Sequence, residues 1–396
     1  MPTTLQTIDS IIEESREKWL TTSHAIHAKP EIGNEEYFAS AALAKLLTEA
    51  GFTVESNVAG HETAFYASFD SGKEGATIAY LAEYDALPVL GHACGHNIIG
   101  TTSVAAAIAL AEQTKRVGGK VVVLGTPAEE GGPNGSAKGS FVRHGYLKDI
   151  DVALMIHPSG RTATTGESLA VNPLDFHFYG QAAHAAAAPE HGINALDAVI
   201  QLFTGINALR QQLPSDVRIH GIITNGGEAP NIIPAYASAR FYLRASTWAK
   251  TEEVTAKVRA IAEGAALATG ATVKIERFQN EVKDLVLNAT LDSILAEELS
   301  DLGEKVYTTK TGLGSTDAGN ISYEVPTAHP YIKIGDEDLI AHTDEFREAA
   351  ASAKGDEALL VGAKALAKTG YRLLTNPALL AQANSDFEVA KHKKIS

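Results

Sequence analysis

The sequence predicts an α/β protein in which a mainly parallel mixed sheet is flanked by helices and a smaller α+β domain is inserted. Two observations predict this class. Short apolar strands alternate with helical segments in the N-terminal part of the chain, an order typical of a parallel sheet covered on both faces. In the middle of the chain the order becomes β-α-β-β-α-β, which is that of a ferredoxin-like sandwich.

The elements of the parallel part are predicted from apolar runs bounded by turn residues. Residues 76–82 and 120–127 are short apolar runs typical of buried strands. The Ala-rich segment 98–115 is periodic and ends before Gly118 and Gly119, as a helix does. The predicted helices are residues 5–20, 35–51, 98–115 and 136–147, and the strands are residues 76–82, 120–127 and 151–157.

The inserted domain is expected at residues 166–282, so that residues 1–165 and 283–396 form the other domain. Beyond the insertion, the pattern predicts a helix at 285–302, a strand at 328–334, a largely continuous helix at 343–369 and a frayed polar tail at 388–396. Within the insertion, the predicted strands are 174–180, 217–224, 236–245 and 272–278, and the helices are 194–212 and 250–269.

The composition excludes several classes of partner. The formal net charge of −15 argues against binding to nucleic acids or anionic membranes, which requires a basic face. No apolar run reaches the roughly 18 residues needed to span a membrane. The charged, amphipathic N-terminus does not resemble a signal peptide and a single cysteine cannot form an internal disulfide, so a cytoplasmic location is expected.

Polar side chains gather where three of the predicted strands end. Asp85, Cys94 and His96 follow the first strand, Glu129 and Glu130 follow the second, and His157 closes the third. Ligands of parallel sheets bind beyond the carboxyl ends of the strands, so these side chains should meet at one edge. The pattern predicts a metal site there.

Cys94 and His96 are the first candidate ligands. A lone cysteine is most often a small buried apolar residue. Here a thiolate and an imidazole one residue apart can face the same ion, and Gly95 between them relaxes the steric limits on the turn. This ligand set suits Zn²⁺, and the nearby carboxylates extend the choice to Mn²⁺.

Glu129 and Glu130 divide two tasks in this hypothesis. Paired glutamates are most often solvated charge, but these two follow a buried strand and precede Gly131 and Gly132. One carboxylate could bind metal while its neighbour acts as a general base toward water whose pKa the metal lowers. Hydrolysis of an amide bond follows from these parts.

Eight segments of the chain together resemble the M20 metallopeptidase family. Within that family they are similar to the amidohydrolase branch of aminoacylases, auxin-conjugate hydrolases, aminobenzoyl-glutamate hydrolases and related dipeptidases. The resemblance extends in family order from about residue 24 to 346. The segments are YDALP, GHACGHN, PAEEGG, the end of strand 151–157, QAAH, NIIP, GSTDAGN and AHTDEF.

The resemblance implies a catalytic domain with two divalent ions and a lid domain that forms a homodimer. It implies that Cys94 bridges the ions, at a place held by an aspartate in the wider family. His96 and His157 would complete one metal site, and Glu130 and His342 the other. Glu129 would be the general base, and Asp85 would orient a ligand.

Two positions depart from the wider family pattern. Glu83 stands where many members have a metal-binding histidine, and the amidohydrolase branch also lacks that histidine, so Glu83 is not expected to be a ligand. Gly319 stands where many members have an arginine, which leaves a substrate contact at that position unsupported.

Three residues of the inserted domain are candidates for substrate contact. His184 alone would be interpreted as a histidine bonded to a backbone carbonyl, but the resemblance implies that it reaches across a dimer to polarise the scissile carbonyl. Asn231 and Arg244 would bind substrate, and Arg244 suits a bidentate grip on a terminal carboxylate. Arg244 could instead be an exposed strand residue.

These inferences predict metal-dependent hydrolysis of N-acyl or N-aminoacyl amino acids. One alternative is a dipeptidase that acts on substrates with a free amino group. Another is a metal-binding protein without catalysis, against which the presence of Glu129 beside Glu130 argues.

Overall fold

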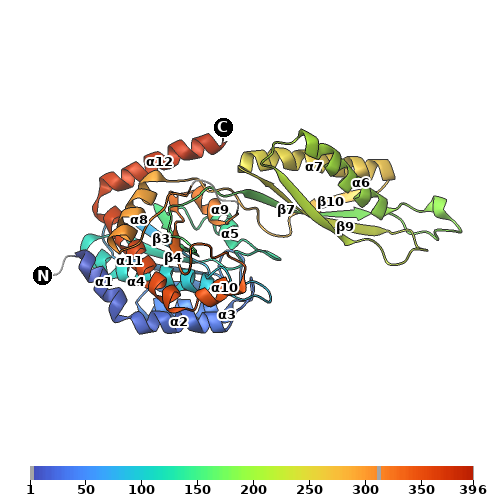
Figure 1. Cartoon of the computed structure of the whole chain (residues 1–396). Coiled ribbons are helices and arrows are strands. Elements are labelled where there is room, and N and C mark those ends of the chain that lie inside the picture. The colour runs from blue at the N-terminus through green and yellow to red at the C-terminus, as the bar shows by residue number, and fades with distance from the viewer. Residues whose placement is uncertain (1–3, 310–313, 396) are drawn as a thin grey trace. The chain divides into compact units, whose positions relative to one another are not determined.

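The computed structural model describes residues 4–309 and 314–395 and divides into two compact units (Figure 1). Unit 1 comprises Met1–Ser168 and Leu285–Ser396, and unit 2 comprises Leu169–Asp284. The predicted insertion, residues 166–282, covers nearly the same stretch as unit 2. Among the described residues, no helix is long and apolar enough to cross a membrane.

The main sheet of unit 1 has the strand order β1-β2-β4-β3-β5-β11. β3 is parallel to both β4 and β5, and β5 is parallel to β11, whereas β1 and β2 join antiparallel at one edge. The predicted α/β class with a mainly parallel mixed sheet is therefore confirmed. The strands are β1 (Thr53–Ser56), β2 (Phe65–Asp70), β3 (Thr77–Ala82), β4 (Lys120–Gly125), β5 (Val152–Leu154) and β11 (Thr327–Ala328).

Successive side chains of the central strands point to opposite faces of the sheet, so they contribute to two separate cores. Tyr80 of β3 and Val123 of β4 belong to a core that includes α4 and α11, while Leu81 and Val122 belong to a second core with α5 and α9 on the other face. The unit therefore has helices on both faces of its sheet. The helices are α1 (Thr4–Glu14), α2 (Arg16–Ala28), α3 (Tyr37–Glu49), α4 (His96–Val117), α5 (Ala137–Arg143), α8 (Ala289–Asp301), α9 (Ala318–Ser322), α10 (Asp344–Ala349), α11 (Ala353–Thr375) and α12 (Pro377–Ile395).

Several predicted elements of unit 1 were wrong in extent. Helix 5–20 is two helices, α1 and α2, and helix 343–369 is interrupted between α10 and α11. The predicted tail at 388–396 is helical as far as Ile395, because α12 continues from Pro377. Strand 151–157 ends at Leu154, and a second short sheet of β6 (His157–Ser159) and β12 (Tyr331–Lys333) begins at His157.

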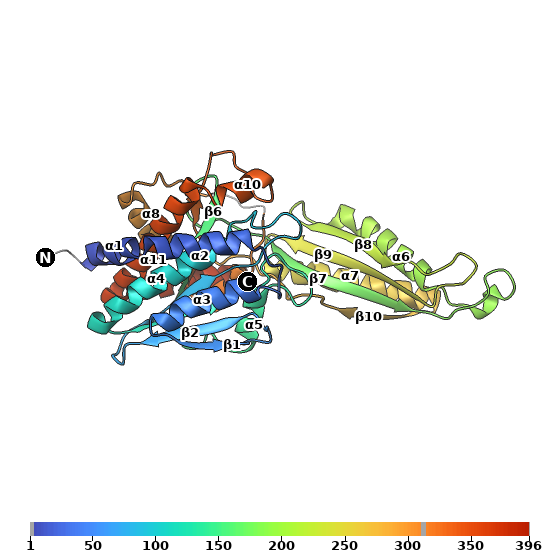
Figure 2. The same cartoon turned by 90° about the horizontal axis from the view of Figure 1, so that it is seen from below.

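Unit 2 is a four-stranded antiparallel sheet with two helices on one face (Figures 1 and 2). Its strand order, β10-β7-β9-β8, is that of the predicted ferredoxin-like β-α-β-β-α-β arrangement. Asn194 caps the first helix by accepting from the backbone N–H groups of Leu196 and Asp197. The elements are β7 (Ala170–Tyr179), α6 (Ala195–Leu209), β8 (Arg218–Asn225), β9 (Tyr236–Ala245), α7 (Trp248–Thr269) and β10 (Thr272–Glu276).

Candidate metal and catalytic centre

The candidate centre lies at the carboxyl ends of the parallel strands of unit 1. β3 and β4 are in register from Thr77 and Lys120 to Ala82 and Gly125, so both strands end at the same edge. Glu83 and Asp85 follow β3, and Glu129 and Glu130 follow β4. His157 follows β5 as the first residue of β6 rather than the last of its strand, which corrects the predicted position without moving it from this edge.

The loop that carries Cys94 and His96 depends on Gly95. Gly95 has a φ of 75°, and a Cβ atom there would lie 2.8 Å from Cγ of Pro158. Helix α4 starts immediately afterwards at His96. Glycine is therefore favoured at this position for two reasons, the left-handed turn and the close approach to the segment that carries His157.

Asp85 connects the two loops. Its Oδ1 lies 3.0 Å from Nδ1 of His96, and its Oδ2 accepts from the backbone N–H of Glu130 at 3.0 Å. The carbonyl oxygen of Asp85 also lies 2.9 Å from the same Nδ1, so this nitrogen carries the proton and Nε2 is left for an ion. His157 is oriented similarly, with Nδ1 2.7 Å from the carbonyl oxygen of Pro158.

The predicted ligands fall into overlapping groups whose ligand atoms lie within 4.8 Å of one another. Cys94, Glu130 and His342 form one group, and His96, Glu129 and Glu130 form another. Nε2 of His342 lies 3.6 Å from Oε2 of Glu130. Cys94 thus joins the group predicted around Glu130 and His342, while its proposed bridging to the His96 group stays a prediction.

Glu83, which is not expected to be a ligand from the family pattern, lies in the group with His96 and His157. Its Oε2 is 3.5 Å from Nε2 of His96. The expectation that Glu83 is not a metal ligand stays a prediction, but its position makes it part of the centre. The family pattern already marked this position, because many members have a metal-binding histidine there.

The electrostatics of the groups fit a bound cation. Burial alone would lower the pKa of His96, but Asp85, Glu83 and Glu130 outweigh it and raise that pKa well above its ordinary value. Burial, followed by the charges of Glu130 and Glu129, raises the pKa of the Cys94 thiol. Nε2 of His96 is buried and has no hydrogen-bond partner among the described residues. Carboxylates, a thiol and free imidazole nitrogens at one place are the donor set that a divalent transition ion requires.

Glu129 has the surroundings of a group that holds a proton. Burial is the largest cause that raises its pKa, and Glu83, Glu130 and Asp317 raise it further. The side chain keeps 13% of its surface exposed, so it can still reach solvent or a substrate. A carboxylate in this position can exchange a proton with a reacting group beside it.

Three further residues at this edge were not predicted. Lys138 and Asp317 are buried beside Glu83, and Asp317 belongs to the segment GSTDAGN that carried the resemblance. His329 follows β11 and stacks on His157 with ring centroids 5.4 Å apart. The segment GSTDAGN was a signal for Asp317, whereas nothing in the sequence pattern separates Lys138 and His329 from packed core residues.

The predicted residues of unit 2 lie toward two opposite ends of its sheet. His184 and Asn231 are neighbours, because the carbonyl of Asn231 accepts from the N–H of Ala185 and His184 forms a β-bridge with Ile232. Arg244 pairs in register with Val171, at the start of β7. Its Nε donates to Nε2 of His220 at 3.2 Å.

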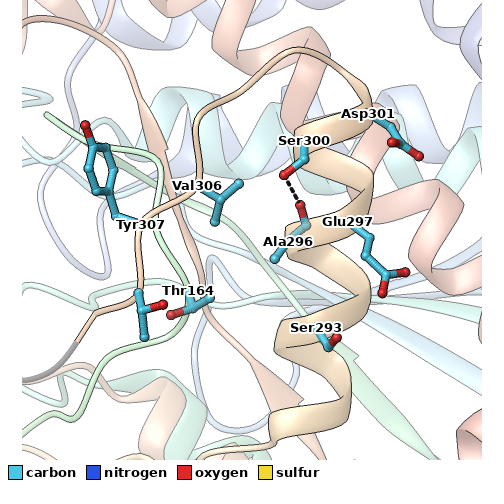
Figure 3. A pocket seen from close by; sticks show the side chains of 9 residues that line it. Thr164, Ser293, Ala296, Glu297, Ser300, Asp301, Val306 and Tyr307 are labelled. Atoms are coloured by element: carbon cyan, nitrogen blue, oxygen red, sulfur yellow. Dashed lines mark hydrogen bonds between the residues drawn. The ribbon is translucent and has the colours of Figure 1, made fainter.

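A separate open pocket of about 600 Å³ lies along α8 (Figure 3). Figure 3 shows Ala296 and Ser300 on the side of α8 that faces Val306 and Thr164, and Glu297 and Asp301 also belong to the lining. Its lining includes none of the predicted site residues, and none of its residues belongs to the groups of candidate metal ligands found in the described part of the chain. The pocket therefore does not contribute to the candidate centre.

The family of the chain is shown by its similarity to known proteins. Residues 80–371 match peptidase family M20/M25/M40. The chain belongs to this family. It is 39% identical over 394 residues to a mouse Xaa-Arg dipeptidase, covering 95% of this chain and 90% of that protein. It is 38% identical over 317 residues to a p-aminobenzoyl-glutamate hydrolase polypeptide of Escherichia coli K12, covering 75% and 65% of the two chains.

Two solved structures share the fold. An aminobenzoyl-glutamate utilization protein from Klebsiella pneumoniae aligns with a TM-score of 0.75 at 20% identity, over 93% of this chain and 98% of that one. A Bacillus subtilis M20 peptidase described as dinuclear and metal-binding aligns with a TM-score of 0.64 at 18% identity, over 91% and 99%. The M20 chain described here is thus a hydrolase with the fold of its family.

Proposed function

We propose that this M20 hydrolase uses two divalent ions, zinc or manganese, to cleave the amide that links an acyl or aminoacyl group to an amino acid. The observation that carries this proposal is the overlap of three groups of candidate ligands, which are Cys94, Glu130 and His342, then His96, Glu129 and Glu130, and then Glu83, His96 and His157. The fit of that donor set to a cation supports the two metal sites. Bound ions would supply Lewis acidity, which lowers the pKa of water and polarises the scissile carbonyl.

The protein's own residues would divide the remaining work. Glu129 would accept the proton of the attacking water and return it to the leaving amine, a role that its partly exposed carboxylate beside His96 supports. Asp85 holds the His96 ring and the Glu130 backbone in fixed relation through its two oxygens. This fixed geometry spares the site from reorganising during the reaction.

His184 is proposed as the donor to the developing oxyanion. Its Nδ1 accepts from the backbone N–H groups of Ala186 and Ala187 at 3.3 and 3.2 Å. In the neutral ring the proton is then on Nε2, which can donate to a substrate oxygen. The exposed position of His184 in unit 2 leaves that nitrogen accessible.

The distance between His184 and Arg244 supports a homodimer. Tyr236 begins β9 near Asn231 and His184, and Arg244 lies eight residues further along, roughly 26 Å at the usual rise of a strand. One unit 2 cannot place both side chains on one small substrate. We propose that each site combines Arg244 of its own chain, which binds the substrate carboxylate, with His184 and Asn231 of the partner.

The second candidate is a dipeptidase acting on substrates with a free amino group. The similarity to a mouse Xaa-Arg dipeptidase over nearly the full length of both chains favours this candidate. Both candidates use the same centre and release an amino acid with a free carboxylate. They differ only in what binds the acyl or aminoacyl side of the amide.

Product detection by mass spectrometry on one substrate panel tests both candidates. The panel contains N-acetyl and N-aroyl amino acids, dipeptides ending in arginine and dipeptides ending in neutral residues, each with and without a chelator. Chelator-sensitive cleavage of the acylated compounds alone identifies an aminoacylase-type enzyme, and cleavage of the dipeptides alone identifies a dipeptidase. Absence of chelator-sensitive cleavage throughout, with metal bound, would contradict the proposed function.

A further inference from the structure

Lys138 is a fully buried lysine in contact with two carboxylates at the candidate centre. Its ammonium lies 2.6 Å from Oε1 of Glu83 and 2.5 Å from Oδ1 of Asp317. Its backbone N–H also donates to Oδ2 of Asp317 at 3.1 Å. The three residues come from α5, the end of β3 and the start of α9, so the ammonium joins three separate segments.

A third carboxylate belongs to the same cluster. Glu83, Glu129 and Asp317 each present an oxygen within 4.8 Å of the other two. Neither oxygen of Glu83 makes a hydrogen bond within the described part of the chain, although both are buried. The side chain is therefore held by its ion pair with Lys138 and by the nearby charge of His96.

This arrangement differs from an ordinary buried ion pair. One ammonium faces two carboxylates in direct contact, with a third close by. Buried carboxylates at such distances repel one another strongly unless a cation lies among them. The same three oxygens are the kind of ligand that binds a hard divalent cation such as Mg²⁺, Ca²⁺ or Mn²⁺.

We infer that the ammonium of Lys138 occupies the place of a third divalent cation. In this role Lys138 is a positioning residue. It fixes Glu83 and Asp317 beside His96 and Glu129, and it closes the carboxylate cluster to metal ions. Replacing the ammonium with a neutral side chain of similar size opens the cluster, and a divalent ion then restores the missing positive charge.

The test counts bound ions in Lys138→Met and in the wild type. Both proteins are saturated with Mn²⁺, freed of excess by gel filtration, and analysed for metal per chain by mass spectrometry. We expect one more ion per chain in Lys138→Met, and a larger rise in its unfolding temperature on addition of Mn²⁺. An ion count equal to that of the wild type would overturn the inference.

Two further variants keep the result decisive. Lys138→Met combined with Asp317→Asn removes a cluster carboxylate as well, and should return the ion count to that of the wild type. Lys138→Gln retains hydrogen-bonding groups and is used if Lys138→Met does not fold. Failure of both neutral variants to fold in Mn²⁺ would also overturn the inference, because the ion is required to replace the charge.

The count is independent of the proposed function. It is a difference from the wild type, so it does not depend on how many ions the wild type binds or on whether it cleaves any substrate. A wild type without ions would contradict the proposed two-metal enzyme, yet a single ion in Lys138→Met would still support the role of the ammonium.

Discussion

At the scale of single residues, the centre is organised by charges that balance one another in the interior. Asp85 orients His96, and Lys138 neutralises part of the charge of Glu83 and Asp317. Isolated buried carboxylates would be costly, so each of these acids depends on a specific partner. Glu129, by contrast, remains partly exposed, which is what a proton-transfer group requires.

Glu129→Gln tests that assignment. The amide cannot accept a proton, so we expect kcat to fall by about 10²–10⁴-fold, the usual range for loss of a general base. The metal content should be unchanged, because the side chain keeps its size and Glu130 remains. Glu130→Gln serves as the comparison and should lose metal as well as activity. Near-normal turnover by Glu129→Gln would remove Glu129 from the mechanism.

The sequence predicted the polar residues of the loops better than those of the interior. Cys94, His96, Glu129 and Glu130 were recognisable because they follow apolar strands and share short Gly-rich segments. Lys138 was not recognisable, because a lysine in the segment Ser-Ala-Lys-Gly-Ser is usually solvated and its burial depends on residues far along the chain. Lys138 pairs with Asp317, which is far from it in the sequence. A local sequence pattern contains no information about such a contact.

At the scale of elements, strand ends and one glycine determine where the ligands meet. The apolar runs predicted β3 and β4 closely because buried parallel strands have few polar residues. β1 and β2 were missed because they are short, mixed in polarity and antiparallel at an edge. The break before His157 was also missed, since an apolar run does not show where a strand changes its partner.

Gly95→Ala and Gly72→Ala separate two roles of a glycine. Both residues have positive φ, 75° and 69°, so an alanine costs about 1–2 kcal/mol at either position. A Cβ atom at Gly72 meets nothing within 4 Å, whereas at Gly95 it meets Pro158 at 2.8 Å. We expect Gly95→Ala to lose roughly 1–3 kcal/mol more in the free energy of unfolding, from overpacking.

Denaturant unfolding of both variants, together with their metal content, checks this expectation. Gly72→Ala should bind metal normally. Gly95→Ala should bind less, because Cys94 and His96 flank the displaced turn. Equal stability and equal metal content in the two variants would show that the approach of Gly95 to Pro158 is unimportant.

At the scale of the whole molecule, the chain consists of two units with different sheets. The β-α-β-β-α-β order predicted unit 2, because few topologies accommodate that order with short connections. The order of strands in the main sheet could not be predicted in the same way. The strand order depends on which strand follows each helix in the sheet. In the sequence β11 comes after the inserted unit 2, yet it belongs to the same sheet as the strands that precede that unit.

Because β9 is long enough to separate His184 from Arg244, the two residues are proposed to act in different sites of a homodimer. Two different inactive variants should then complement each other. His184→Ala and Glu129→Gln should each inactivate a homodimer, since every site then lacks one group. In a mixed dimer, one site would combine the intact Glu129 of the first chain with the intact His184 of the second, while the other site would lack both. Co-expression of the two inactive variants should therefore restore activity, approaching a quarter of the wild-type rate for random pairing of subunits. Absence of such complementation in dimers shown to be mixed would mean that each chain completes its own site.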